Sequence, residues 1–60
     1  MWVDIKINCE DEQEIISHLQ ILIKQIKKET KNQNGEITKA VTLSDNNCYG
    51  YHACKITPTL

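Results

Sequence analysis

Two histidines and three cysteines are the side chains of this 60-residue sequence that could bind a metal or act as nucleophiles. They are Cys9, His18, Cys48, His52 and Cys54. His52 and Cys54 would share one face of a strand, and Cys9 and His18 could converge on that face. Structural zinc sites, however, usually draw their ligands from close pairs such as C-x-x-C, and no such pair occurs here. We therefore expect no metal and no cofactor.

The thiols also give little sign of redox or catalytic chemistry. Cys48 and Cys54 lie six positions apart, or roughly 20 Å along one continuous strand, so they cannot form a disulfide with each other. Cys9 precedes a predicted helix N-terminus, which lowers a thiol pKa, but it stands among acidic residues that raise it again. These acids are Glu10, Asp11, Glu12 and Glu14. We expect reduced cysteines and no enzymatic activity, with an active site formed between subunits as the open alternative.

Residues 2–8 alternate between apolar and polar side chains, which predicts a half-buried strand. Val3, Ile5 and Ile7 would face the core. Ile5 is the central residue of this inward set, and we predict that it packs in the core against a helix.

The pattern of residues 12–30 predicts an amphipathic helix. Asp11 and Glu14 form the D-x-x-E pattern of a capping box at its start. Apolar residues at positions 15, 16, 19, 22, 23 and 26 fall on one stripe, with Leu22 near its centre. Acids open the helix and lysines close it, an order that complements the helix dipole. The following Asn34-Gly35 pair is typical of a helix end.

Two further strands are predicted at residues 36–43 and 48–57, separated by a turn at residues 44–47. Inward residues of the first would be Ile37, Val41 and Leu43, and Pro58 would end the second. The fold class is then α+β in the order β-α-β-β, a three-stranded sheet with one helix on one face. The strand order could be 1-2-3 or 1-3-2, and we favour 1-3-2, the arrangement of a split β-α-β unit. Residues 1–60 form a single domain.

Size and composition limit the function. A chain this short has a marginal core unless a metal, a disulfide or a second subunit supplements it. The net charge of −1 argues against general binding of duplex nucleic acid. No apolar run is long enough to span a membrane and no secretory signal is visible, so we expect a cytoplasmic protein without membrane contact. Every basic residue is Lys, which indicates an AT-rich bacterial or phage genome.

The order of elements resembles that of the 4-oxalocrotonate tautomerase family, whose members also need oligomers to complete a core. That resemblance implies an N-terminal catalytic proline, exposed by removal of the first methionine, and arginines that hold an acidic substrate. In this sequence Trp2 follows Met1 and no Arg is present. The resemblance covers topology and extends to no functional residue.

One helix can cover only one side of the sheet, and the favoured parity of the third strand places all the aromatic residues on the other side. The opposite parity would bury the two tyrosines. The candidate binding residues there are Trp2, Lys6, Tyr49, Tyr51 and Lys55. A further candidate is Ile21, which would project from the polar side of the helix. We predict a non-enzymatic protein-interaction module that binds a second copy of itself, as a homodimer or larger homo-oligomer, or another protein. The alternative is a binder of single-stranded nucleic acid, with bases stacked on the aromatic face.

Overall fold

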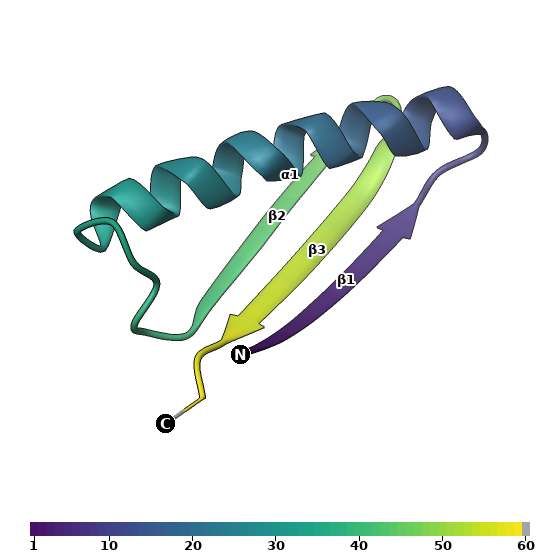
Figure 1. The fold of residues 1–60 in the computed structure, drawn as a ribbon. Helices are drawn as coiled ribbons and strands as arrows, with labels where there is room; N and C mark the ends of the chain where they lie inside the picture. Colours follow the sequence, from purple (N-terminus) through teal and green to yellow (C-terminus); the bar gives the residue numbers. More distant parts are fainter. Residues whose placement is uncertain (60) are drawn as a thin grey trace.

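The computed structural model describes residues 1–59 and consists of one helix packed on a three-stranded sheet (Figure 1). The elements are β1 (Trp2–Asn8), α1 (Glu12–Asn32), β2 (Val41–Asn47) and β3 (Gly50–Thr57). This is the predicted α+β fold in the order β-α-β-β, and the first strand has the predicted bounds. No helix within residues 1–59 is long and apolar enough to cross a membrane.

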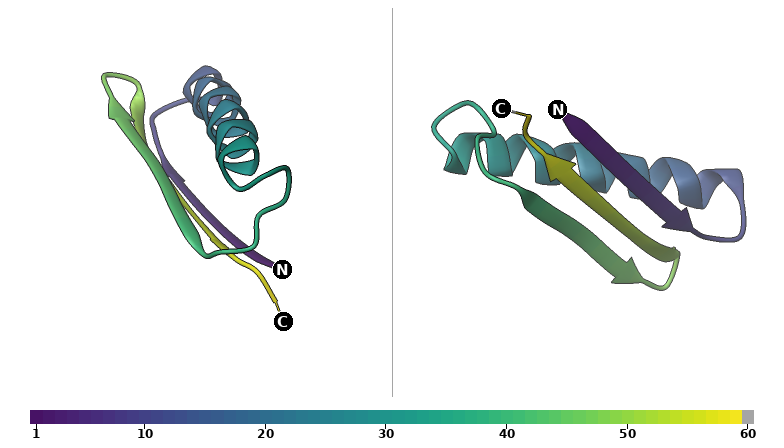
Figure 2. Two further views of the ribbon diagram at one scale, coloured as in Figure 1. Left: turned by 90° about the vertical axis from the view of Figure 1, so that its left-hand side faces the viewer. Right: turned by 90° about the horizontal axis from the view of Figure 1, so that it is seen from below.

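The sheet has the strand order β1-β3-β2, which confirms the favoured topology. β3 pairs antiparallel with both neighbours, so β1 and β2 are the two edges (Figure 2). The register joins Ile5 to Cys54 and Ile7 to His52. Opposed residues share a face of a sheet, so the inward residues of β1 lie on the same side as the buried residues of β3.

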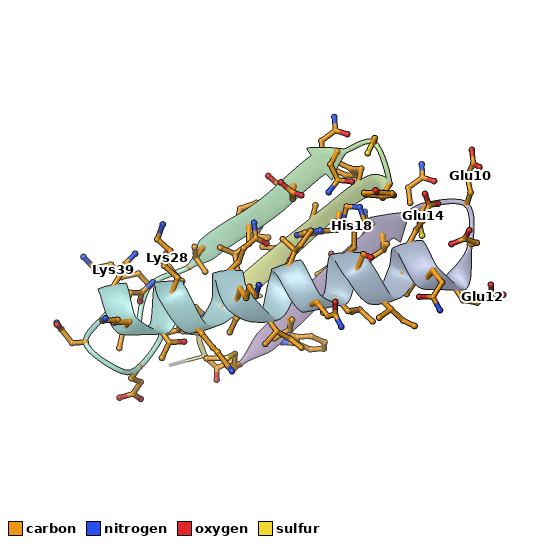
Figure 3. All side chains as sticks on the ribbon, turned by 90° about the horizontal axis from the view of Figure 1, so that it is seen from above. Glu10, Glu12, Glu14, His18, Lys28 and Lys39 are labelled. Carbon is orange, nitrogen blue, oxygen red and sulfur yellow. The ribbon has the colours of Figure 1, made fainter. Side chains whose placement is uncertain are left out.

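The helix begins at the predicted capping box. The Asp11 side chain accepts a hydrogen bond from the Glu14 amide at 3.0 Å, and the Glu14 carboxylate accepts one from the Glu10 amide at 2.8 Å. The helix runs two residues beyond the predicted end and is followed by Asn34 and Gly35, both with positive φ. Its acidic start, with Glu10, Glu12 and Glu14, lies at the opposite end of the domain from Lys28 and Lys39 (Figure 3).

The second strand was predicted too early along the chain: it spans Val41–Asn47 instead of residues 36–43. The side chain of Gln33 explains the difference, because its carbonyl oxygen accepts hydrogen bonds from the amides of Thr38 and Lys39, at 2.8 and 2.9 Å. Those amides cannot also join a strand ladder, so residues 38–40 stay in the loop that leaves the helix.

The predicted turn at residues 44–47 is also wrong, because these residues complete β2. The reversal falls at Cys48 and Tyr49, where the side chain of Asn47 accepts a hydrogen bond from the Tyr49 amide at 2.8 Å. The third strand therefore starts at Gly50 and not at residue 48. Gly50 has φ +131°, a conformation that suits glycine, and it passes close to Asn8 on β1.

The core of this domain is very small. Among residues 1–59, the buried apolar side chains are those of Leu22, Cys54 and Ile56, with several half-buried neighbours packed around them. The prediction for Leu22 is confirmed. Ile5 lies on the helix-facing side but remains 44% exposed, so its prediction as a core residue is wrong. The cause is the position of the helix, which packs on β2 and β3 and leaves β1 largely uncovered.

Candidate functional site

Two histidines form the only fully buried polar pair in the described part of the chain. His18 of α1 and His52 of β3 are both 0% exposed, and their Nδ1 atoms lie 2.7 Å apart. Their rings meet edge to face, with centroids 5.0 Å apart. Figure 3 shows His18 reaching from the helix over the sheet. The sequence left open whether these two histidines converge, and in the structure they meet on the inner face through a direct hydrogen bond.

Gln25 determines which ring nitrogens carry protons. Its amide nitrogen donates to the backbone carbonyl of Ser44 at 2.9 Å, which leaves its Oε1 atom to accept from His52 Nε2 at 2.8 Å. Neutral His52 is therefore protonated on Nε2, and its Nδ1 accepts a hydrogen bond from Nδ1 of His18. The chain His18–His52–Gln25–Ser44 thus connects the helix to β3 and to β2.

The environment of His52 favours its neutral form. Burial lowers the pKa of His52 below its ordinary value of 6.5, and the neighbouring His18 lowers it further, while Asp45 acts in the opposite direction. The Nε2 atom of His18 is buried and has no hydrogen-bond partner within residues 1–59. A buried polar atom without a hydrogen-bond partner lowers the stability of the folded state by about 1–3 kcal/mol. The buried histidine pair therefore destabilises the isolated domain.

The cysteines do not join the histidines in a metal-binding cluster. No group of three or more Cys, His, Asp or Glu side chains within residues 1–59 is arranged to hold a metal ion. Cys54 is buried in the core, whereas Cys9 and Cys48 both line an open hollow of about 410 Å³ at the hairpin end. Burial, followed by the charges of Glu14 and Asp11, raises the pKa of the Cys9 thiol, as the acidic surroundings predicted.

The largest departure from the predicted site is the orientation of the helix about its axis. The buried or half-buried helical positions include His18, Ile21, Leu22 and Gln25, whereas much of the predicted apolar stripe is exposed. Since Gln25 contacts β2, helical geometry of about 100° per residue turns Leu19 by about 120° and Ile23 by about 160° away from the side of Gln25. The predicted phase was wrong because His18 and Gln25 occupy inward positions that the pattern assigned to apolar residues.

An exposed apolar surface results from this orientation, and we call it the apolar flank. Each member lies on β1 or on α1 and is at least 40% exposed. It consists of Val3 and Ile5 from β1 together with Ile15, Ile16, Leu19 and Ile23 from α1. Within residues 1–59, more large apolar side chains thus belong to the flank than are buried in the core. Exposed apolar clusters of this kind mark interaction sites in soluble proteins.

The predicted binding residues are not assembled into one site. Ile21 is half-buried and does not project into solvent as expected. Lys6, Tyr51 and Lys55 lie on the sheet face away from the helix, as does Trp2, which is 75% exposed.

The aromatic residues of that far face are also well separated. Trp2 pairs with Thr57 at one end of β3, whereas Tyr51 pairs with Asn8 at the other end. Six register positions separate them, or roughly 20 Å, and Tyr49 lies beyond in the turn. Adjacent bases could not stack on rings so far apart, which weakens the nucleic-acid alternative.

The apolar flank was missed by reasoning from the sequence, although a signal for it was present. Positions 18, 22, 25 and 29 also share one helix face, and that face carries two side chains with strong hydrogen-bonding groups, His18 and Gln25. Two histidines in a chain with so few core residues could have suggested a buried polar pair.

Comparisons with protein-family models, with curated proteins and with solved structures found no match to this chain.

Proposed function

We propose that this chain is a non-enzymatic protein-interaction module that assembles with a second copy of itself through the apolar flank. The main observation behind the proposal is that more aliphatic side chains are exposed on the flank than are buried in the core. The flank leaves six aliphatic residues at least 40% exposed, whereas within residues 1–59 the core holds three buried apolar residues and four half-buried ones. A second subunit that covers the flank would supply the core that this short chain lacks.

The hydrophobic effect gives the expected scale. Burying a Leu or Ile side chain fully contributes roughly 1.5–3 kcal/mol, so covering the exposed part of each flank residue contributes about 1 kcal/mol. Six residues on each of two subunits provide enough to offset a substantial part of the cost of association, which is of the order of 4–15 kcal/mol.

Other features support a non-enzymatic role. Both histidines are withdrawn from solvent, and the raised pKa of Cys9 disfavours its nucleophilic thiolate. The lysine-only basic composition supports an origin in a bacterial or phage genome of high AT content. We propose that the module acts in the cytoplasm, as a small accessory protein.

A pair of neighbouring substitutions tests the proposal. Ile23 is 51% exposed on the flank, and the exposed Asn32 lies nine residues further on, which places it on the opposite side of the helix. Ile23→Lys and Asn32→Lys add the same charge to the same helix, and both variants should keep their helical circular dichroism. Sedimentation velocity should show that Ile23→Lys lowers the assembled fraction and that Asn32→Lys does not. Equal assembly of the two variants would exclude the flank as the contact surface.

A further inference from the structure

We propose that two copies pair their β1 strands antiparallel about a two-fold axis through Ile5, so that their sheets join into one six-stranded sheet. This inference builds on the proposed self-assembly and specifies its geometry. β1 is an edge strand of seven residues, and its outer side has no partner strand within the described chain. An edge strand of this kind is a template for pairing with another chain.

The sequence of β1 is complementary to itself in this register. Antiparallel pairing centred on Ile5 sets residue 3 opposite residue 7 and residue 4 opposite residue 6. Val3 then meets the second copy's Ile7 on the helix-facing side, and Asp4 meets the second copy's Lys6 on the other side. Opposite charges and pairs of β-branched residues at directly opposed positions both stabilise antiparallel strands.

Neighbouring registers lack this complementarity. Centring the pair on Asp4 sets two aspartates opposite each other, and centring it on Lys6 sets two lysines opposite each other. The register centred on Ile5 also pairs all seven residues of β1. Within the monomer Asp4 lies beside Lys55, but Lys6 lies beside Ala53, so the lysine has no acidic neighbour on β3.

The same two-fold axis brings the helices together. A two-fold axis perpendicular to the sheet keeps both helices on one face and runs them antiparallel. Both helices would then lie on the face that Val3 and Ile5 line, one on each side of the β1 seam.

Charge along the helices fits this antiparallel arrangement as well. The acidic residues lie at the start of α1 and the lysines towards its end, at opposite ends of the domain (Figure 3). Antiparallel helices place the acidic end of one beside the basic end of the other, which complements both the side-chain charges and the helix dipoles. A parallel arrangement would place like charges together.

A charge-exchange experiment tests the register. Asp4→Lys sets Lys opposite Lys6 of the second copy, and Lys6→Asp sets Asp opposite Asp4. Each substitution converts two attractive pairs into two repulsive ones, so each variant alone should associate roughly tenfold or more weakly than the unaltered chain. Mixed in equal amounts, the two variants have opposite charges at both positions. Native mass spectrometry should then show predominantly the mixed dimer.

Three outcomes would overturn the β1 pairing. They are unchanged assembly of the single variants, a mixture that does not recover assembly, and an unaltered chain that is monomeric. Assembly that Ile23→Lys weakens but the charge variants leave intact would retain the flank contact and reject the strand pairing. If Asp4→Lys loses its fold because residue 4 then faces Lys55, adding Lys55→Asp restores that pair within the chain, and this double variant takes its place in the mixture.

Discussion

Acidification should destabilise this domain through His52. The folded state lowers the pKa of His52, chiefly by burial, so the neutral ring is favoured there. The unfolded chain takes up a proton as the pH falls through about 6.5, the ordinary value. The unfolded state then binds more protons than the folded state, and linkage requires the free energy of unfolding to fall with the pH. The contribution of His52 is complete above pH 6.5 and is lost progressively below it.

Proton linkage sets the size of this effect. One additional proton bound by the unfolded chain gives a slope of at most about 1.4 kcal/mol per pH unit. Between about pH 8 and pH 5.5, the accumulated loss reaches at most about 1.4 kcal/mol. A domain of this length has roughly 3–5 kcal/mol of stability in total, so the loss would be readily measured. Asp45 favours the charged form of the His52 ring and so reduces this loss of stability. The half-buried Glu14, one helical turn from His18, is the other charged group near the histidine pair on the helix.

Urea unfolding followed by circular dichroism measures how the free energy of unfolding changes with pH. The protein concentration is kept constant because assembly also contributes to stability. His52→Gln keeps an amide donor but removes the titrating ring, so its stability should change much less between those pH values. Asp45→Asn removes the group that opposes the lowering of the His52 pKa. The free energy of unfolding of this variant should therefore keep falling down to more acidic pH values than that of the unaltered chain. An identical pH dependence of His52→Gln and the unaltered chain would refute the reasoning.

Three other predictions follow from the packing. Leu22→Ala, in the core, should lower the free energy of unfolding by about 2–5 kcal/mol and leave the chain largely unfolded. Leu19→Ala, on the flank, should preserve the helix and weaken assembly roughly tenfold. Equal loss of helical circular dichroism in the two variants would refute this prediction. Gly50→Ala should greatly reduce thermal stability, because its Cβ would lie 2.5 Å from a β1 carbonyl oxygen and its φ is +131°. Thiol alkylation followed by mass spectrometry should modify exposed Cys48 rapidly and buried Cys54 only on unfolding; equal rates would contradict the buried position.

Local patterns in the sequence were sufficient for much of the fold. The alternation of residues 2–8 predicted β1, and the capping box at Asp11 located the start of the helix. The favoured parity of β3 placed His52 and Cys54 on the helix side, where the structure has them, although the sequence left the opposite parity open. These features depend on side chains close to one another in the chain.

Features that depend on distant side chains were not predicted. The start of β2 depends on Gln33, whose side chain holds the amides of the following loop. The phase of α1 depends on His18 and Gln25, which find their partners on β3 and β2. Periodicity identifies an apolar stripe but does not say whether the sheet or a second subunit covers it. The site was therefore placed on the aromatic face, whereas the exposed aliphatic side chains lie on α1 and on β1.

The molar mass in solution tests the central claim most directly. Sedimentation equilibrium of the unaltered chain at neutral pH should give twice the chain mass of 6.9 kDa, and the mass should fall towards that of one chain on dilution. Such a result would show that two copies associate reversibly, as covering the apolar flank requires. A mass of 6.9 kDa at every concentration up to the high micromolar range would contradict the account.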